Sequence, residues 1–327
     1  MKAWQVSRLG EPEDVLELAE VPRPSPGPGQ LLVRVLAAAA NFFDVLMIQG
    51  NYQVRPPLPF TPGSELCGEV VELGEGVTGF APGDRVIGSA ALPYGAFAEY
   101  ALMEARGAFP APAALDDAEA APFFVTYQTG WFGLHRRAHL VAGETLLVHA
   151  AAGGVGSGAV QLGKAAGARV IGVVGGPEKA ALARELGADV VVDRYAEDFV
   201  AVVKEVTGGR GADVVYDPVG GDAYAKSTKC IAFEGRIVIV GFTSGTIPTA
   251  TLNHALVKNY SILGLHWGYY QRVDPESIVA CHAELTRLAD AGLIRTLVSE
   301  RLPLSGVPDA LRRLGAGSTT GRLVFQP

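Results

Sequence analysis

Cysteine is scarce in this chain of 327 residues, and its placement excludes two kinds of scaffold. The three cysteines are Cys67, Cys230 and Cys281, and no two of them form a CxxC-type spacing. A disulfide framework and a cysteine-rich zinc site both require clustered cysteines, so neither is expected. We interpret the three thiols as reduced and packed in the interior.

Positive charge is also in short supply. The chain has 27 Lys and Arg residues against 34 Asp and Glu residues, a formal net charge of −7. General affinity for nucleic acid or an anionic membrane is not expected, because phosphate groups are bound by clustered Lys and Arg. The one small basic run, "HRRAH" at 135–139, is interpreted as a solvated helix end.

Long apolar runs are missing as well. No stretch approaches the roughly 18 uninterrupted apolar residues of a membrane span. The first residues, "MKAWQVSRLGEPED", lack a basic segment followed by an apolar core. We therefore expect a cytoplasmic protein without membrane contact.

What the chain does contain is two contrasting patterns, in keeping with a length that suggests about two domains. From residue 30 to about 100, short β-type runs alternate with Gly and Pro, which predicts a β-rich domain. From about residue 126, near-continuous apolar runs alternate with helix-like segments, which predicts a parallel, doubly wound sheet. The expected strands are 145–150, 169–174, 189–193, 213–217 and 236–240, with helices over 177–186 and 196–206.

The tail differs again. A helix should begin after Asp274, as N-cap, with Pro275 at its first position, and end at Gly292. The last strand, "GRLVFQ", should return to the β-rich domain.

Side chains are removed just where the first strand of the second pattern ends, in "AAAGGVG". The spacing of Ala151, Gly153 and Gly156 matches G-x-G-x-x-G with Ala in the first place, after a predicted strand and before a helix. Gly153 would let the backbone approach a pyrophosphate, and Gly156 would let the helix pack on the strand. The context predicts a dinucleotide site; the alternative is a glycine-rich packing contact.

The residues after the second strand bear on which dinucleotide is bound. An NAD site usually carries an acid there, which binds the ribose hydroxyls. Here "VVGGPEK" (173–179) has two glycines in that place, and Lys179 follows at the start of a helix. Space and positive charge favour a 2′-phosphate, so we predict NADPH rather than NADH. Two alternatives stay open: Lys179 as an ordinary solvated residue, and Glu178 as an acid opposing a phosphate.

A series of motifs runs in order along nearly the whole chain: "EVPRPSPGPGQLLVRV", "NFFDVLMIQGNY", "PFTPGSELCGEVVELGEGV", "PGDRVIG", "GAFAEYA", "HAAAGGVG", "ALARELGAD" and "DVVYDPVGG". It resembles the medium-chain dehydrogenase/reductase superfamily and, within it, the zinc-independent quinone oxidoreductase (zeta-crystallin-like) branch. The resemblance implies an α/β fold in three segments. These are a GroES-like β-rich catalytic domain over 1–122, a Rossmann NADPH-binding domain over 123–266, and a return to the catalytic domain over 267–327.

The resemblance also bears on metal binding. In zinc alcohol dehydrogenases of this superfamily, a Cys, a His and a second Cys hold the catalytic metal. The corresponding positions here are Asn41, Ser64 and Val125, none of which offers a thiolate or imidazole. Glu65 remains beside them, and the four-cysteine structural zinc lobe is missing. We therefore expect no metal.

Without a metal, the resemblance implies hydride transfer, in the cleft between the two domains, from NADPH to an acceptor that is already activated. Quinones and alkenes conjugated to a carbonyl fit this requirement. Asn41 and Tyr52 match positions where relatives place polar groups beside the substrate and the nicotinamide. Tyr52 is the expected hydrogen-bond donor to the acceptor oxygen; the alternative is a packing aromatic.

The same resemblance assigns the cofactor contacts. Gly153, Gly154 and Val155 would meet the pyrophosphate. Lys179 would flank the adenosine phosphate together with Arg194, although the neighbouring Tyr195 leaves a one-residue ambiguity. The remaining predicted contacts are Thr129 near the nicotinamide and Gly241 and Phe242 along its ribose.

The segment "LGLHWGYYQR" (263–272) is unusually aromatic for a loop leaving the last strand. His266 and Trp267 could contact a flat acceptor there, or they could simply pack at a domain or subunit junction. Relatives are commonly dimers paired through the Rossmann sheet edge, so a homodimer is expected. Two alternative functions stay open, an enoyl-thioester (acyl-CoA type) reductase and a non-catalytic NADPH-binding protein.

Overall fold

The computed structural model describes all residues from Met1 to Pro327 and divides into two compact domains. Domain 1 comprises Met1–Val125 and Thr286–Pro327, and domain 2 comprises Thr126–Leu285. The chain returns to domain 1 later than the predicted residue 267. The reason is a buried hydrogen bond of 3.1 Å, in which Gln128 Nε2 of domain 2 donates to the carbonyl oxygen of Ile278 in the tail helix. This helix, residues 275–290, therefore belongs largely to domain 2.

Domain 1 is built on a sheet of six strands in the order β13–β14–β3–β4–β5–β6, and β3 also pairs with β6. The four strands β3 to β6 therefore close on themselves, which leaves few unpaired edges. The strands are β3 (Gln30–Ala39), β4 (Glu65–Leu73), β5 (Arg85–Ala90), β6 (Tyr100–Pro110), β13 (Val298–Pro303) and β14 (Arg322–Gln326).

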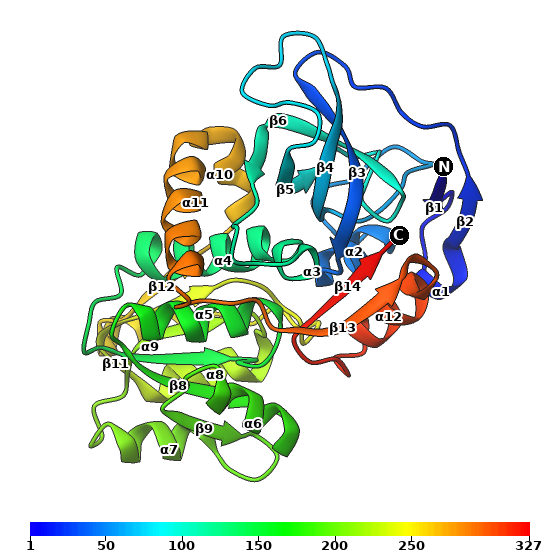
Figure 1. Cartoon of the computed structure of the whole chain (residues 1–327). Helices are drawn as coiled ribbons and strands as arrows, with labels where there is room; N and C mark the ends of the chain where they lie inside the picture. The colour runs from blue at the N-terminus through cyan, green and yellow to red at the C-terminus, as the bar shows by residue number, and fades with distance from the viewer. The chain divides into compact units, whose positions relative to one another are not determined.

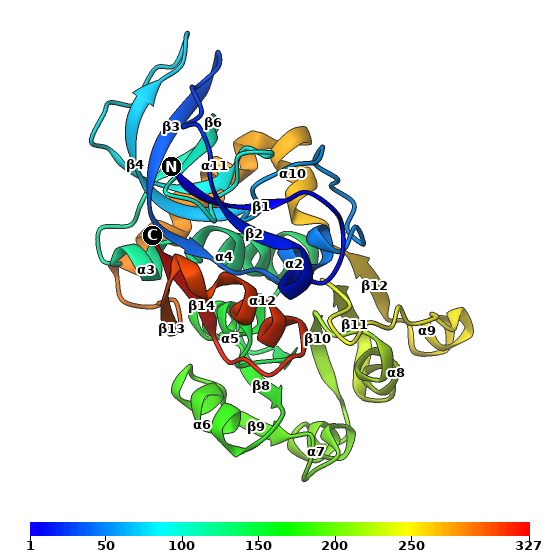
Figure 2. The ribbon, with the colours of Figure 1, turned by 90° about the vertical axis from the view of Figure 1, so that its right-hand side faces the viewer.

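The last strand returns to the first domain as predicted. β14 pairs antiparallel with β3, with Val324 opposite Ala39 and Phe325 opposite Ala38. Figures 1 and 2 both show this red strand beside the blue strand β3. Phe325 is fully buried and meets Phe97 edge to face at 5.2 Å, so the strand completes the apolar core.

Smaller elements surround this sheet in domain 1. A separate hairpin pairs β1 with β2. The hairpin strands and the helices are β1 (Lys2–Val6), β2 (Leu16–Glu20), α1 (Pro12–Val15), α2 (Phe42–Ile48), α3 (Asp117–Ala120), α12 (Val307–Gly315) and the short 3-10 helix η2 (Leu304–Gly306).

Domain 2 contains the predicted parallel sheet, in the order β12–β11–β10–β7–β8–β9. Its strands are β7 (Thr145–His149), β8 (Arg169–Val174), β9 (Val190–Asp193), β10 (Ala212–Asp217), β11 (Ile231–Ile239) and β12 (Ser261–Gly264). Every residue of β7 and β10 is buried, as expected for central strands covered on both faces. Because strands are added on both sides of β7 by right-handed crossovers, the connecting helices cover opposite faces.

The helices of domain 2 follow the sequence closely, with one exception. They are α4 (Phe123–Trp131, across the domain boundary), the π-helix η1 (Phe132–Arg137), α5 (Gly154–Ala165), α6 (Pro177–Glu185), α7 (Phe199–Val206), α8 (Gly221–Cys230), α9 (Leu252–Lys258), α10 (Trp267–Val273) and α11 (Pro275–Asp290). The segment 263–272, expected as a loop, instead forms the end of β12 and most of α10. The Tyr270 ring packs on Phe132 at 4.6 Å and under the Arg136 guanidinium, contacts that the local pattern does not reveal.

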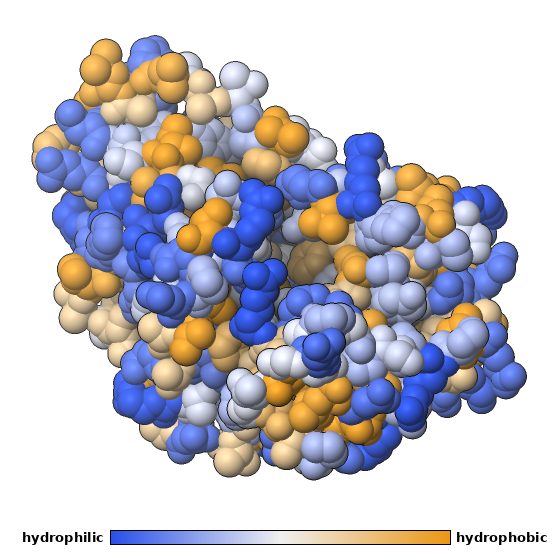
Figure 3. Space-filling model, turned by 90° about the horizontal axis from the view of Figure 1, so that it is seen from above, coloured by the Kyte–Doolittle hydropathy of each residue, from blue (hydrophilic) through white to orange (hydrophobic).

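None of the helices combines the length and apolar character needed to cross a bilayer. On the face seen in Figure 3, hydrophilic residues are spread widely, with smaller hydrophobic patches between them.

Candidate functional site

The carboxyl ends of the parallel strands bring most of the predicted cofactor residues to one edge of domain 2. Gly153 follows β7, Gly175 follows β8, Arg194 follows β9 and Gly241 follows β11. In doubly wound sheets this edge is where nucleotides bind. The structure therefore gathers residues that are separated by up to about ninety positions in the sequence.

The glycine turn after β7 has the geometry that the motif predicts. Ala150 adopts a left-handed φ of 51°, and the N–H of Gly153, the N-cap of α5, donates to its carbonyl oxygen at 2.8 Å. A Cβ on Gly156 would lie 2.1 Å from that same oxygen, so only glycine fits. The first N–H groups of α5, including those of Gly154 and Val155, have no partner within the helix and face the turn as a potential anion site.

Two side chains after β9 pack against Gly175, the first residue after β8. The Arg194 guanidinium stacks over the Tyr195 ring at 5.0 Å and donates to its hydroxyl at 3.0 Å. A Cβ on Gly175 would approach Tyr195 at 3.0 Å and Arg194 at 3.2 Å, so the glycine makes room for both. Arg194 and then Lys179 lower the pKa of the exposed Tyr195, which places all three side chains in one positive neighbourhood.

Asp193, the last residue of β9, holds the loop between the strand ends in place. Asp193 Oδ1 accepts the backbone N–H groups of Gly176 at 2.9 Å and Tyr195 at 3.1 Å. These hydrogen bonds lower its pKa, so the group stays ionised and fixes the loop. Gly176 itself has φ 94°, which glycine adopts readily.

The other predicted contacts of domain 2 lie on different elements. Thr129 is buried on α4, whereas Gly241 and Phe242 are half-buried after β11. The N-cap of α10, His266, is exposed, and its ring stacks on Tyr269 at 6.2 Å. Trp267 is only 8% exposed, so it offers little free ring surface to a flat acceptor.

Two polar residues at this edge were not singled out from the sequence. His149 ends β7, is buried, and shares a 2.8 Å hydrogen bond with Ser227 Oγ. Burial lowers its pKa, so the imidazole is neutral at neutral pH. Asp217 ends β10, and its Oδ1 accepts the N–H groups of Val219 and Gly220. A polar residue ending an otherwise apolar strand was the available signal for both.

Domain 1 holds a buried polar cluster around Glu65. The Glu65 carboxylate accepts hydrogen bonds from the Val125 N–H at 2.6 Å, Asn41 Nδ2 at 3.1 Å and Arg322 at 2.9 Å. The same Arg322 nitrogen donates to Asn41 Oδ1 at 2.8 Å. Burial raises the pKa of Glu65, while Arg322 and the three hydrogen bonds lower it. The Asn41 amide is thus engaged at both ends by protein groups.

The three positions that the family resemblance matches to zinc ligands all join this cluster. Asn41 and Val125 bond Glu65, and Ser64 Oγ donates to Asp44 at 2.7 Å. Their groups are an amide, a backbone N–H and a hydroxyl, and no three His, Cys, Asp or Glu side chains in the chain are placed to hold a metal. The donor set does not fit zinc, which prefers thiolate, imidazole and carboxylate.

Tyr52 lies close to this cluster. Its ring stacks on Phe43, the second residue of α2, at 5.4 Å. Burial and, to a lesser extent, the Asp44 carboxyl raise the pKa of its phenol, which keeps it protonated and able to donate.

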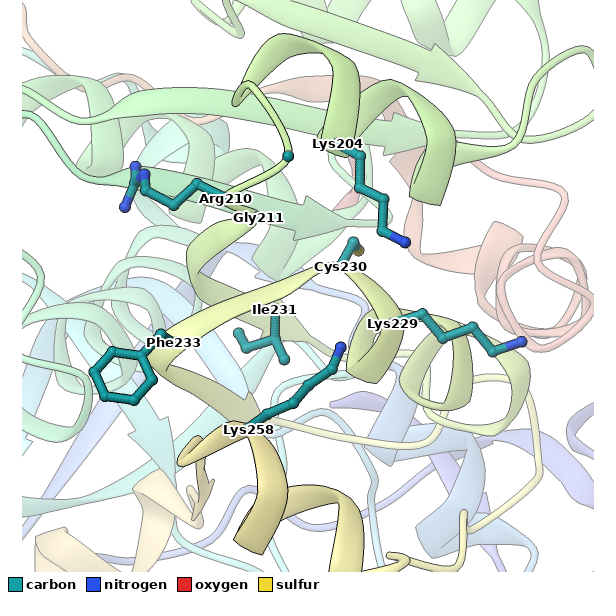
Figure 4. Close-up of a pocket in the computed structure, with 9 residues that line it drawn as sticks. Lys204, Arg210, Gly211, Lys229, Cys230, Ile231, Phe233 and Lys258 are labelled. Atoms are coloured by element: carbon teal, nitrogen blue, oxygen red, sulfur yellow. The ribbon is translucent and has the colours of Figure 1, made fainter.

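A cavity of about 310 Å³ lies elsewhere, at the edge of the domain 2 sheet where β10 and β11 begin (Figure 4). Lys204, Lys229 and Lys258 come from the last turns of α7, α8 and α9, and Lys258 Nζ donates to the carbonyl oxygen of Thr228 at 2.7 Å. Figure 4 shows Lys204 and Lys258 extending toward Cys230. Because helix C-termini carry partial negative charge, these cations stabilise the helix ends, and the cavity is separate from the glycine turn.

The comparisons with known proteins agree with this layout. Residues 27–113 match the alcohol dehydrogenase GroES-like domain, and residues 154–281 match the zinc-binding dehydrogenase domain. The chain is 38% identical over 301 residues to quinone oxidoreductase-like protein 2 homolog of Nematostella vectensis, covering 91% of this chain and 82% of the relative. Escherichia coli quinone oxidoreductase complexed with NADPH superimposes with a TM-score of 0.92 at 32% identity, covering both chains completely.

One further match concerns a much larger protein. Over 311 residues the chain is 35% identical to a segment of phthioceranic/hydroxyphthioceranic acid synthase of Mycobacterium tuberculosis, covering 95% of this chain and 14% of the synthase. The two-domain layout, the glycine turn and full-length similarity to quinone oxidoreductases together assign the family. The chain is an oxidoreductase of the quinone oxidoreductase branch of the medium-chain dehydrogenase/reductase superfamily.

Proposed function

We propose that this protein transfers hydride from NADPH to a quinone or a conjugated enone without zinc. The observation that carries the proposal is the pair Arg194 and Tyr195 beside Gly175, where an NAD-specific site would have an acid, with Lys179 near enough to lower the pKa of Tyr195. These side chains offer an ammonium, a guanidinium and a phenol, the donors that a 2′-phosphate requires.

The remaining donors also fit a dinucleotide. The glycine turn and the N-terminus of α5 would hold the pyrophosphate, because a Cβ at Gly156 is excluded and the first N–H groups are free of helix partners. NADPH, when bound, supplies the hydride. Thr129, Gly241 and Phe242 are proposed to position its nicotinamide end, and Tyr52 to donate a hydrogen bond to the acceptor oxygen.

The choice of acceptor follows from the chemistry of domain 1. Glu65 is matched by Arg322, and Asn41, Ser64 and Val125 offer no thiolate or imidazole. A carbonyl that needs a Lewis acid to stabilise its alkoxide would find no such group here. Quinones and enones spread the incoming charge over a conjugated system, so they are the favoured acceptors. His266 and Trp267 remain proposed substrate neighbours, although Trp267 is buried.

The first test is a fluorescence titration of NADPH and NADH with the wild type, Lys179→Ala and Arg194→Ala. We expect tighter binding of NADPH, and at least a tenfold loss in either variant with NADH unchanged, since each cation is proposed to contact only the 2′-phosphate. Lys229→Ala, an exposed lysine of the same domain, is the matched control. Equal binding of the two cofactors by the wild type would refute the phosphate site.

The second test is turnover. NADPH oxidation is followed with a panel of quinones and enones, and a wild type that consumes NADPH with none of them would contradict the proposed reaction. NADPH binding without turnover on any acceptor would instead favour a non-catalytic nucleotide-binding role.

The synthase match favours a second candidate, reduction of an enoyl thioester on an acyl chain. An enoyl thioester is also a conjugated acceptor, so the same site could serve it. Comparing kcat/KM for an enoyl-CoA with that for the best quinone decides between them, since a thioester reductase should favour the former by orders of magnitude.

We also propose a homodimer formed by a second copy at the β12 edge of domain 2. β12 is the last strand of the sheet, with one edge unpaired. Beside it in sequence, Ile247, Leu252, Leu256 and Val257 are 74–79% exposed, an unusual gathering of apolar side chains. Light scattering should give the mass of a dimer, and Leu256→Glu should shift it to a monomer. A monomeric wild type would contradict the proposal.

A cytoplasmic location is part of the same proposal. The three cysteines are free and buried, a state that suits a reducing compartment.

A further inference from the structure

The Asp44 carboxyl is enclosed in domain 1 without a cation bonded to it. It has no exposed surface. Its Oδ1 accepts a hydrogen bond from Ser64 Oγ at 2.7 Å, and its Oδ2 accepts the backbone N–H of Asn41 at 2.9 Å. Both partners are uncharged, so neither supplies the positive charge that keeps a buried carboxylate ionised.

The charged and titratable groups around Asp44 do not remedy this. They are Glu65 on β4, Arg322 on β14 and Tyr52 after α2. Arg322 bonds Glu65 and Asn41, so one guanidinium faces two carboxyl groups and pairs with only one. Burial raises the pKa of Asp44 to about 7; Glu65 adds to the rise, while the two hydrogen bonds and Arg322 oppose it.

A capping role alone does not require this arrangement. Asn41 is the N-cap of α2 and Asp44 is its third residue, and the two form a capping box. That motif uses one carboxyl oxygen on the N-cap N–H, and it works equally well on exposed helices. The second oxygen of Asp44 instead bonds Ser64, which is half-buried and reaches solvent.

The Asp44–Ser64 hydrogen bond can reverse with protonation. A neutral Asp44 has an O–H group that donates to Ser64 Oγ, and this frees the serine hydrogen for an acceptor outside the cluster. A backbone N–H cannot relay a proton in this way, so of the two groups bonded to Asp44 only the serine hydroxyl can pass its proton on.

We propose that Ser64, backed by Asp44, delivers the proton that completes the reduction put forward under Proposed function, on which this inference rests. When hydride adds to a carbon of the acceptor, the electron pair of the conjugated double bond moves to the carbonyl oxygen. The Ser64 O–H bond breaks as its proton passes to that oxygen, and the serine oxygen takes the carboxyl proton of Asp44. Asp44 is left as a carboxylate; it regains its proton through Ser64, whose hydrogen moves to Asp44 as water protonates the serine oxygen, so each turnover consumes one hydride and one proton.

The test compares Asp44→Asn and Ser64→Ala with two matched controls in the same domain. Asp84→Asn removes an exposed carboxylate that also accepts a backbone N–H, and Ser318→Ala removes an exposed hydroxyl that donates to a backbone carbonyl. Circular dichroism establishes that each variant is folded. If Asp44→Asn does not fold, Ser64→Ala alone carries the test.

With an enone as acceptor, kcat should fall about 100-fold or more in both variants and stay unchanged in both controls, since positioned general acids contribute about 10²–10⁴. The loss should be smaller with a quinone, whose reduced anion is a weakly basic phenolate and needs the proton less. The wild-type kcat should decline above about pH 7, where Asp44 loses its proton. This alkaline decline should be missing from the pH profile of Asp44→Asn.

A measurement without turnover separates this inference from the proposed function. The infrared difference spectrum of wild type minus Asp44→Asn should show the carbonyl stretch of a protonated carboxyl at pH 6 and lose it by pH 9. A spectrum with an ionised Asp44 at pH 6 overturns the inference. Variants that keep the wild-type kcat and its alkaline limb overturn it as well while leaving the proposed function intact. A wild type that reduces no acceptor overturns both.

Discussion

Replacing Asp44 by Asn should change how the stability of domain 1 depends on pH. The carboxyl has an ordinary pKa of 3.8 when unfolded and about 7 when folded, because burial disfavours the charged form. Between these values the folded protein holds a proton that the unfolded chain has lost, so stability falls as pH rises. The two pH units between pH 5 and the folded pKa, at 1.36 kcal/mol each, amount to about 3 kcal/mol, and this loss is nearly complete at pH 8. Asparagine does not titrate and lacks this loss.

The assay is urea unfolding at pH 5, 6, 7 and 8, with a signal restricted to domain 1. Trp4 lies in domain 1, whereas Trp131 and Trp267 lie in domain 2, so replacing the latter two by Phe leaves one local reporter. The free energy of unfolding of the wild type minus that of Asp44→Asn should fall by about 3 kcal/mol between pH 5 and pH 8.

The exposed Asp84→Asn control should follow the wild type across the same range. A difference between wild type and Asp44→Asn that stays flat to within about 1 kcal/mol would refute the reasoning, because it would mean that Asp44 is ionised in the folded protein.

Three more predictions concern single positions. Gly156→Ala places a Cβ 2.1 Å from the Ala150 carbonyl oxygen and should weaken NADPH binding more than tenfold, measured by titration; unchanged affinity would contradict the anion role of the turn. Gly175→Ala crowds Arg194 and should reduce NADPH affinity several-fold while sparing NADH and the melting temperature. Arg322→Met leaves Glu65 buried without its cation and should lower the free energy of unfolding in urea by about 3–5 kcal/mol, with a smaller loss for Arg322→Lys. An unchanged free energy of unfolding in Arg322→Met would show that the pair adds no stability.

Much of domain 2 could be predicted because its signals are local. The apolar runs at 169–174 and 213–217 become β8 and β10 within one residue, and the Pro and Gly boundaries of α6 are confirmed. β11 begins at Ile231, which pairs with Ala212, earlier than the predicted residue 236; the regular pairing resumes only at Arg236, after an irregular stretch in which Glu234 has a φ of 56°. A left-handed residue inside a strand is not visible in a hydrophobic pattern.

The cluster in domain 1 could not be predicted in this way. Arg322 and Asn41 are 281 positions apart, and nothing in either local sequence indicates that they share a hydrogen bond. The family resemblance predicts Asn41 as a polar group beside the substrate, and this role stays a prediction; the structure adds that its amide bonds Glu65 and Arg322. Asp44 passed unnoticed because its spacing from Asn41 is that of an ordinary helix cap. Its enclosure is a property of the tertiary fold.

The return of β14 to β3 fixes an order of events during synthesis of the chain. Strands β3 to β6 leave the ribosome early. The cation that neutralises Glu65 is Arg322 on β14, about 200 residues after Val125, where the first segment of domain 1 ends. At typical translation rates of about 5–20 residues per second, that interval is roughly 10–40 s. Domain 2 is contiguous and can complete its sheet during this time. The nascent protein would therefore have a finished nucleotide-binding fold while Glu65 in domain 1 still lacks the cation that pairs with it.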